Sequence, residues 1–469
     1  MDLSKIHSVY FLGIGGIGMS ALARYFNAMG KKVAGYDKTP TILTDELIAE
    51  GIDIHFEDHI RNIPTYIKAL PFDVDNILIV FTPAVPKDHS EYVFFNLNGF
   101  NIKKRAEVLG MITQTEYTIA VAGTHGKTTT SSLVAHILKS AGLDPSAFLG
   151  GISQNYNTNL LLSERLKVQN DFSYKVHLVV VEADEYDRSF LTLHPEIALI
   201  TSVDADHLDI YGDAGQVEES FSLFAKQVKS KLILKKNIVS KINSDGKIPI
   251  TYAVNDDSAD YFAHKIRIEN GFYIYQIVTP FTVFENITLG LPGLHNVENS
   301  VAAVAIACQL NVSESVMRES LASFKGVRRR FDCHIKTEKL IYIDDYAHHP
   351  EELKAAISSA KEMYPGKKIT GIFQPHLFSR TRDFADDFAR SLDLLDECIL
   401  MEIYPARELP IAGITSQMLL DKMKLSDKRI CQKEDLLAEL ANKNLEVLMT
   451  MGAGDIDTFI EPIKKQLTK

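Results

Sequence analysis

The chain has 469 residues, 46% of them hydrophobic and 24% charged, and a formal net charge of −11 at pH 7. One hydrophobic core rarely organises so long a chain, so the length predicts about three domains of an ordinary globular protein. The negative charge argues against a nucleic-acid groove, the lack of a signal peptide or a long apolar run argues against a secreted or membrane-spanning protein, and four scattered cysteines predict reduced thiols in the cytoplasm.

A strand, a glycine turn, a helix and a second strand are predicted at the N-terminus. They are the strand Ser8–Leu12, the helix that runs through Ala28 and the strand Lys32–Tyr36. In the turn, Gly13, Gly15 and Gly18 fit the pattern G-x-G-x-x-G, and Asp37 stands where an acid would bind a ribose. This arrangement predicts binding of NAD or of another nucleotide diphosphate, and the turn alone leaves both open.

A second glycine loop begins after the apolar strand Tyr117–Ala122 and precedes a helix predicted over Ser131–Ala141. Its residues are Gly123, Thr124, His125, Gly126, Lys127, Thr128 and Thr129. Backbone N–H groups and the positive end of a helix bind phosphate, a lysine adds a point charge and a hydroxyl can ligate Mg²⁺. The loop therefore predicts an ATP site, although it is shorter than the common G-x-x-x-x-G-K-[ST] pattern.

Acidic residues follow two further strands of this region. Glu182 is the first polar residue after His177–Val181, where a Mg²⁺ ligand is expected opposite a phosphate loop. The next acids, at positions 184, 185 and 187, are either further ligands or an acidic helix start. After the strand Ile197–Thr201, His207 is either a metal ligand or a hydrogen-bonded loop residue.

Three weaker patterns complete the middle of the chain. Residues 221–241 are lysine-rich and have a helical period, which predicts a helix with a solvated face. Residues 272–289 predict short antiparallel strands beside the main sheet. Asn296 and Asn299 precede a helix over Ser300–Cys308, so they are either helix caps or groups that contact a base or ribose.

The last third repeats the α/β rhythm after an arginine-rich link at 328–330. The predicted strands are Leu340–Ile343, Lys368–Phe373, Glu397–Met401 and Leu445–Met449. Polar clusters follow them at 344–350, 374–380 and 452–455, and parallel strands bring such clusters to one edge of the sheet. The whole chain is therefore predicted to be α/β, with an N-terminal Rossmann-like domain over 1–112, a central P-loop ATPase-like domain with a parallel sheet over 113–326, and a C-terminal Rossmann-like domain over 327–469.

Together these motifs resemble those of the Mur ligases, and in the same order along nearly the whole chain. The matching segments are Gly13–Ser20, Gly123–Thr130, Glu182–Glu185, Ala205–His207, His295 to Asn299, Arg329–Phe331, Asp344–Pro350 and Phe373–Arg380. The short phosphate loop is itself typical of that family. Within the family, the Gly13 turn and the Phe373–His376 strand end are similar to the members that add L-alanine.

The resemblance implies an ATP-dependent amide synthesis through an acyl phosphate, with Mg²⁺ in two sites and with UDP-N-acetylmuramate, L-alanine and ATP as partners. It assigns Lys127, His207 and Arg330 to catalysis, and Thr128, Glu182 and His207 to Mg²⁺. For ATP it implies the loop Gly123–Thr129 with Asn296, Asn299, Arg330 and Asp345; for the sugar nucleotide, Gly15, Gly16, Ile17, Gly18 and Met19; for the amino acid, His376 and Arg380.

Under this reading the first glycine turn binds UDP and not NAD. Leu377 departs from the family pattern, which often has arginine there, so alanine docking is expected to depend more on Arg380. The nearest alternative is the relative that adds a tripeptide to the same sugar nucleotide in cell-wall recycling. A nicotinamide-dependent oxidoreductase and a non-catalytic nucleotide-binding regulator leave most of the motifs unexplained. We expect no membrane or nucleic-acid partner and a monomer or weak homodimer.

Overall fold

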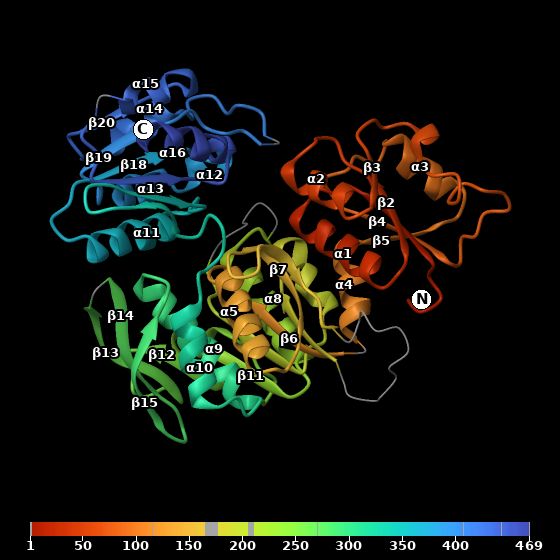
Figure 1. The fold of residues 1–469 in the computed structure, drawn as a ribbon, viewed down its shortest axis with the longest axis horizontal. Helices are drawn as coiled ribbons and strands as arrows, with labels where there is room; N and C mark the ends of the chain where they lie inside the picture. Colours follow the sequence, from red (N-terminus) through yellow and green to blue (C-terminus); the bar gives the residue numbers. More distant parts are fainter. Residues whose placement is uncertain are drawn as a thin grey trace. The chain divides into compact units, whose positions relative to one another are not determined.

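The computed structural model describes residues 2–114, 116–164, 177–204, 211–269, 271–406, 408–441 and 443–468. Figure 1 shows the helices and strands of the chain, coloured from the N-terminus in red to the C-terminus in blue. The chain divides into two compact units. The first consists of Met1–His264, Ile277–Phe284 and Asn299–Leu321, and the second of Lys265–Gln276, Glu285–Glu298 and Ala322–Lys469. Three β-sheets with covering helices confirm the α/β class, and no helix of the described residues is long and apolar enough to cross a membrane.

The N-terminal sheet has the strand order β3-β2-β1-β4-β5, and its neighbouring strands run parallel. Its elements are β1 (Ser8–Leu12), α1 (Ile17–Ala28), β2 (Lys32–Tyr36), α2 (Ile42–Ala49), β3 (Asp53–His55), η1 (Ile60–Asn62), β4 (Ile77–Phe81), α3 (Ser90–Leu97), β5 (Asn101–Lys104) and α4 (Arg105–Gln114). The strand order reverses beside β1, which puts the first glycine turn at the position where open α/β sheets bind ligands. The predicted first two strands and helix end are confirmed.

A polar cluster lies inside this N-terminal sheet. The Tyr10 hydroxyl on β1 donates to Oε2 of Glu91 at 2.7 Å, and Nε2 of His55 lies 3.2 Å from Oε1 of Glu91. The Glu91 side chain is fully buried, and this burial raises its pKa to about 7. Burial also lowers the pKa of His55. Both directions favour an uncharged pair, so the folded state keeps a proton on Glu91 that the unfolded chain releases at lower pH.

This buried acid predicts that the free energy of unfolding falls as pH rises. The folded pKa of Glu91 lies above the unfolded value of 4.5, so its contribution is complete below pH 4.5 and is lost by about pH 7. The full loss is at most about 3 kcal/mol. Urea unfolding of Glu91→Gln at several pH values should show a flatter profile than the wild type. Glu57→Gln, at an exposed acid, is the control, and an unchanged slope in Glu91→Gln would contradict the assignment.

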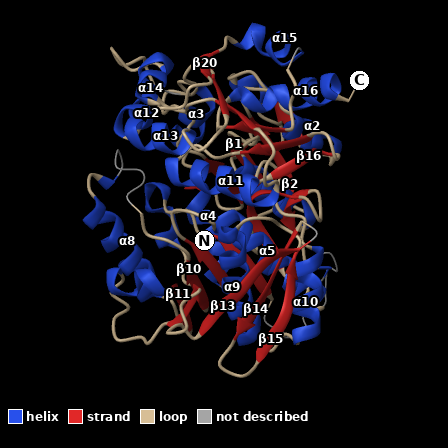
Figure 2. Cartoon of the chain, turned by 90° about the vertical axis from the view of Figure 1, so that its left-hand side faces the viewer, coloured by secondary structure: helices blue, strands red, loops and turns tan. Residues whose placement is uncertain are grey.

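The central sheet has the strand order β15-β14-β13-β12-β11-β10-β6-β9-β7-β8. Its strands are β6 (Tyr117–Ala122), β7 (Ser146–Ser153), β8 (Thr158–Leu161), β9 (Leu178–Glu182), β10 (Ile197–Ile200), β11 (Lys231–Lys235), β12 (Ile250–Val254), β13 (Tyr261–Glu269), β14 (Phe272–Val278) and β15 (Val283–Leu289). Neighbouring strands run parallel along the part of the sheet with the order β13-β12-β11-β10-β6-β9. At one edge, β7 and β8 form an antiparallel pair. Figure 2 shows β13, β14 and β15 side by side at the other end.

The helices of this region are α5 (Lys127–Ser140), η2 (Tyr186–Thr192), α8 (Ala214–Gln227), η3 (Lys236–Lys241), α9 (Leu294–Gln309) and α10 (Glu314–Ser323). The prediction of one helix over 221–241 is wrong. Helix α8 ends at Gln227, and β11 then adds a strand whose central residues Leu232, Ile233 and Leu234 are buried. The lysines on both sides of these residues give the sequence the pattern of a solvated helix. The three apolar residues nevertheless pack between β10 and β12, and their burial favours a strand.

The C-terminal sheet has the strand order β16-β17-β21-β18-β19-β20 and is parallel except for the pair β16 and β17. Its elements are β16 (Asp332–Lys336), β17 (Ile341–Asp345), α11 (Pro350–Met363), β18 (Ile369–Phe373), α12 (Phe378–Asp383), α13 (Ala385–Leu392), β19 (Glu397–Leu400), α14 (Ser416–Lys422), β20 (Lys428–Ile430), η4 (Lys433–Asp435), α15 (Leu436–Ala441), β21 (Val447–Met451), η5 (Asp455–Phe459) and α16 (Ile460–Leu467). All four predicted strands are present. The short edge strands β16 and β20 have polar sequences and were not predicted.

Candidate functional site

The second glycine loop joins β6 to α5 in the first unit, as the sequence predicts. Gly123 has φ of +137° and Gly126 has φ of +80°, a region that side chains disfavour. A Cβ on Gly123 would lie 2.0 Å from Oγ1 of Thr201, and one on Gly126 would lie 2.9 Å from Oδ1 of Asn299. Helix α5 begins at Lys127, four residues before the predicted start, so the N–H groups of its first turn face the loop.

Side chains from the end of β10 hold the loop in place. The Thr124 hydroxyl lies 2.8 Å from the Ser202 hydroxyl, which also accepts the His125 N–H at 2.8 Å. The Thr201 hydroxyl donates to the His125 carbonyl. The Asp204 carboxylate accepts a hydrogen bond from Thr124 at 3.3 Å. These contacts fix the loop before any phosphate binds, which lowers the entropic cost of binding.

Lys127 is the cation of this loop, and it lies among acids. Its ammonium group donates to the Gly123 carbonyl at 2.6 Å and pairs with the Glu185 carboxylate at 2.7 Å. Burial alone would lower the pKa of Lys127, but the nearby charges of Glu185 and Glu182 outweigh it and raise the pKa. The lysine therefore stays charged and is held at the mouth of the loop, where an anion would exchange with Glu185.

Glu182, at the end of β9, faces the hydroxyl of the loop. Thr128 Oγ1 donates to Glu182 Oε1 at 3.0 Å, and the backbone N–H of Gly150 donates to Glu182 Oε2 at 3.0 Å. A hydroxyl and a carboxylate beside a phosphate loop are the oxygen ligands that Mg²⁺ prefers. The pair fits the predicted metal role, although no cluster of three or more metal-binding side chains occurs among the described residues.

Replacement of Gly150 should disturb this pair without touching either residue. A Cβ at position 150 would lie 2.2 Å from Oε2 of Glu182, so the carboxylate must move away from Thr128. We expect Gly150→Ala to lower kcat at least about tenfold, since small displacements of positioned groups cost catalysis strongly. Gly142→Ala is the control. The added Cβ would lie in open space, so the substitution costs only about 1 kcal/mol of backbone strain. Equal activity of the two variants would contradict the assigned position of Glu182.

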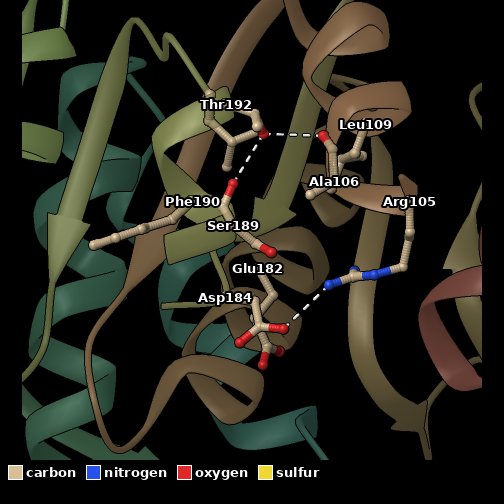
Figure 3. Close-up of a pocket in the computed structure, with 9 residues that line it drawn as sticks. Arg105, Ala106, Leu109, Glu182, Asp184, Ser189, Phe190 and Thr192 are labelled. Atoms are coloured by element: carbon tan, nitrogen blue, oxygen red, sulfur yellow. Dashed lines mark hydrogen bonds and ion pairs between the residues drawn. The ribbon is translucent and has the colours of Figure 1, made fainter. Parts of the chain in front are cut away.

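Glu182 also lines a small pocket (Figure 3). It is lined by Arg105, Ala106, Leu109, Glu182, Asp184, Ser189, Phe190, Thr192 and Leu193. In Figure 3 the Arg105 guanidinium points to Asp184, and Nη2 lies 3.1 Å from Oδ2. Lys104 pairs with Asp187 at 3.4 Å. The acids at 184, 185 and 187 therefore pair with side-chain cations. They also lie at the start of η2, with Glu185 at its N-cap and Asp187 in its first turn, as the alternative of an acidic helix start predicts.

The first glycine turn is closed by the predicted acid. The N–H groups of Gly13 and Ile14 donate to the Tyr36 carbonyl, and the Gly15 N–H donates to Asp37 Oδ2 at 2.7 Å. Helix α1 begins at Ile17 after Gly16, and no side chain caps it. The first-turn N–H groups thus remain for a ligand, whereas the side chain of Met19 is buried and can contribute only its backbone.

In the second unit, Arg330 and Asp345 lie near each other. Oδ2 of Asp345 accepts the Phe331 N–H at 2.7 Å and Oδ1 accepts the Ala347 N–H at 2.8 Å. Burial raises the pKa of Asp345 to about 6, against the opposing charge of Arg330. Arg330 also donates to Glu352 at 3.3 Å. In α9, the Asn296 amide donates to the Pro292 carbonyl at 2.6 Å.

His376 and Arg380 follow β18 in the chain, and both lie near His348. The His376 ring stacks on Tyr404 at 5.8 Å and meets the His348 ring edge-on at 6.2 Å. Burial lowers the pKa of His348 to about 4, and the charge of Arg380 contributes in the same direction. Leu377, the unusual residue here, has φ of +70° and precedes α12. Two rings that the resemblance does not assign, His348 and Tyr404, therefore lie beside His376.

The remaining predictions have mixed outcomes. His207 lies outside the described residues. His349, within the predicted polar cluster at 344–350, is the N-cap of α11, where its Nδ1 accepts the Glu351 N–H at 3.4 Å. Ser202 contacts the loop and is not revealed by the sequence, because its partner His125 is 77 positions away. The sequence singles out Glu185 only as one of the acids after β9, and it does not predict the pairing with Lys127, 58 positions away. Their one available signal was their position at the ends of strands that flank β6. Glu408, which accepts a hydrogen bond from the Ser379 N–H at 3.0 Å, was also missed.

Three family models match consecutive parts of the chain. The model for the Mur ligase family catalytic domain covers residues 8–117, the middle-domain model covers 121–307, and the glutamate ligase domain model covers 329–454. Among similar curated proteins, a UDP-N-acetylmuramate–L-alanine ligase of Flavobacterium johnsoniae is 52% identical over all of both chains. The protein of the same name from Parabacteroides distasonis is 50% identical over 100% of this chain and 99% of its own.

Solved structures agree with these matches. The structure of a UDP-N-acetylmuramate–alanine ligase from Thermotoga maritima matches with a TM-score of 0.79 and 27% identity, over 98% of this chain and 99% of that one. A murein peptide ligase from Psychrobacter arcticus has the same fold, with a TM-score of 0.68 and 22% identity over 98% of both chains. With family models along most of its length and full-length relatives at half identity, the chain belongs to the Mur ligase family.

Proposed function

We propose that the chain joins L-alanine to the lactyl carboxylate of UDP-N-acetylmuramate in an ATP-dependent reaction that releases ADP and phosphate. The observation that carries this proposal is the phosphate loop with Lys127 held at its mouth and Glu182 facing Thr128. The names of the full-length relatives at about half identity supply the substrates. The tight turn at Gly15, with exposed first-turn N–H groups, provides a second and separate nucleotide site.

The reaction has two steps. An oxygen of the lactyl carboxylate attacks the γ-phosphorus of ATP, the bond to the β,γ-bridging oxygen breaks, and ADP leaves with the electron pair. The nitrogen of alanine then attacks the acyl carbon, phosphate leaves with the former carboxylate oxygen, and the amine releases a proton. The protein mainly supplies charge and position for these steps.

Lys127 and the N–H groups at the start of α5 neutralise the β- and γ-phosphates. Because Glu185 pairs with Lys127 in the structure, phosphate binding exchanges one anionic partner of the lysine for another. Thr128 and Glu182 would hold one Mg²⁺, and His207 would contribute to a second. When bound, the metal supplies positive charge next to the transferred phosphoryl group.

Other residues take the roles that the family resemblance assigns. Asn299, next to Gly126, and Asn296 contact the adenosine. Asp345 contacts the ribose and Arg330 the phosphates. His376 and Arg380 bind the alanine, with Arg380 pairing the carboxylate. We further propose that the enzyme acts in the cytoplasm as a monomer or weak homodimer.

Phosphate release tests the substrate assignment. The enzyme is given Mg-ATP and UDP-N-acetylmuramate with, in separate reactions, L-alanine, glycine, L-serine or L-alanyl-D-glutamyl-diaminopimelate. We expect the highest kcat/KM with L-alanine. Release with the tripeptide alone would replace the proposal by the cell-wall recycling reaction, and reduction of NAD without ATP turnover would exclude a ligase.

A further inference from the structure

Arg105 lies between the first glycine turn and the acids that follow β9, all within the first unit. It is the first residue of α4, and its guanidinium faces Gly18 in the first turn of α1. A Cβ on Gly18 would lie 2.7 Å from Nη1 and 2.9 Å from Cδ of Arg105. Glycine at position 18 therefore leaves room for the Arg105 side chain. The G-x-G-x-x-G pattern alone would explain this third glycine by close packing of the helix.

One end of the guanidinium is anchored. Nη2 donates to Oδ2 of Asp184 at 3.1 Å, and Oδ1 of Asp184 in turn accepts the Tyr186 N–H at 3.1 Å. Among the described residues, Asp184 is the only hydrogen-bond and ion-pair partner of the Arg105 side chain. Nη1, on the side of Gly18, and Nε are thus available to an anion bound at the turn, and the planar fork of arginine suits two phosphate oxygens.

The helix that carries Arg105 is itself fixed to the central part of the unit. The Thr192 hydroxyl on η2 donates to the Ala106 carbonyl at 2.9 Å, as Figure 3 shows. A Cβ on Gly110 would lie 2.7 Å from the Thr192 carbonyl oxygen, so α4 and η2 are in close contact. The pocket beside Arg105 is also lined by Glu182, the proposed Mg²⁺ ligand. Arg105 is therefore placed where a sugar nucleotide would run from the glycine turn toward the phosphate loop.

We propose that Arg105 binds the diphosphate of the sugar nucleotide and that Asp184 is a positioning residue that orients the guanidinium. This inference rests on the proposed function, because it places UDP-N-acetylmuramate at Gly15–Met19. It adds a ligand contact from α4, outside the glycine turn. Neighbouring cations are engaged differently: Lys127 lies at the phosphate loop, Lys104 pairs with Asp187, and Lys103 pairs with Glu107. Arg105 instead faces the glycine turn.

Calorimetric titration without ATP tests this contact directly. The ligands are UDP-N-acetylmuramate, UDP and uridine, and the proteins are the wild type, Arg105→Ala, Arg105→Lys, Asp184→Asn and the control Lys103→Ala. Lys103 carries the same charge two residues away and pairs with Glu107 at 3.4 Å. We expect Arg105→Ala to weaken binding of both diphosphates about tenfold to a hundredfold, with uridine binding unchanged. Lysine should recover part of the loss.

The positioning role of Asp184 has its own readout. Asp184→Asn should weaken diphosphate binding in the wild-type background and have no further effect in Arg105→Ala, since its action passes through the arginine. Equal affinity of Arg105→Ala and the wild type for UDP-N-acetylmuramate would overturn the inference while leaving the proposed function standing. A wild type that binds neither diphosphate would overturn the proposed sugar-nucleotide site and the inference with it. If Arg105→Ala does not fold, Arg105→Lys and Asp184→Asn decide the question in the same way.

Discussion

Lys127→Ala should lower the rate of phosphate release about a thousandfold or more. The lysine supplies the charge closest to the phosphate loop, and loss of one positioned group that stabilises transition-state charge typically costs two to three orders of magnitude. Substrate-dependent phosphate release under saturating ATP measures the effect. Retention of more than about a tenth of wild-type kcat would contradict the role of the loop.

The same substitution also has a structural cost, which a second variant separates from catalysis. The carboxylate of Glu185 is almost fully buried and would lose its cation, which destabilises a protein by about 3 kcal/mol. The double variant Lys127→Ala with Glu185→Gln removes both charges, so it should regain most of the thermal stability and none of the activity. Lys139→Ala, at the far end of α5, is the charge-matched control and should remain active.

Glu182→Gln should lower kcat about a hundredfold and raise the Mg²⁺ concentration needed for half-maximal activity. Glutamine keeps an oxygen that can accept the Thr128 hydroxyl, 3.0 Å away in the wild type, but it removes the charge that a hard cation requires. Initial rates over a range of Mg²⁺ concentrations at saturating ATP measure both quantities.

The control for this variant is Glu219→Gln, which removes the same charge from an exposed position on α8. It should show the wild-type dependence on Mg²⁺. A Glu182→Gln enzyme with an unchanged Mg²⁺ requirement would place the metal on other ligands. A loss of folded protein would appear in the far-ultraviolet circular dichroism spectrum, and Glu182→Asp would then test the same position with its charge retained.

The strands and turns around the nucleotide sites could be predicted because local pattern and tertiary role agree there. The strands Ser8–Leu12 and Tyr117–Ala122 are short apolar runs, each followed by a glycine in a positive-φ conformation that other residues rarely adopt. Burial on both faces of a parallel sheet favours such runs wherever they occur in the chain. The Lys127 loop was therefore predicted in place, although the start of α5 was not, because threonines are poor indicators of a helix interior.

Features that depend on distant partners could not be predicted. The pairing of Glu185 with Lys127 depends on β9 lying beside β6, and the sequence does not state that order. The strand β11 could not be predicted because lysines flank its three buried residues and make the segment resemble a solvated helix. The contact of Arg105 with Gly18 joins residues that are 87 positions apart and belong to different elements. In each case the deciding interaction is tertiary and leaves no local pattern.

The most direct test of the ligase mechanism follows one oxygen atom. UDP-N-acetylmuramate labelled with ¹⁸O in its lactyl carboxylate is incubated with the enzyme, Mg-ATP and L-alanine, and the released phosphate and the nucleotide product are analysed by mass spectrometry. An acyl phosphate intermediate predicts one ¹⁸O atom in each phosphate and a product that carries one alanine residue and has lost one of the ¹⁸O atoms of the labelled carboxylate. Unlabelled phosphate, formed without the amide, would mean that the enzyme hydrolyses ATP with water and would contradict the proposed function.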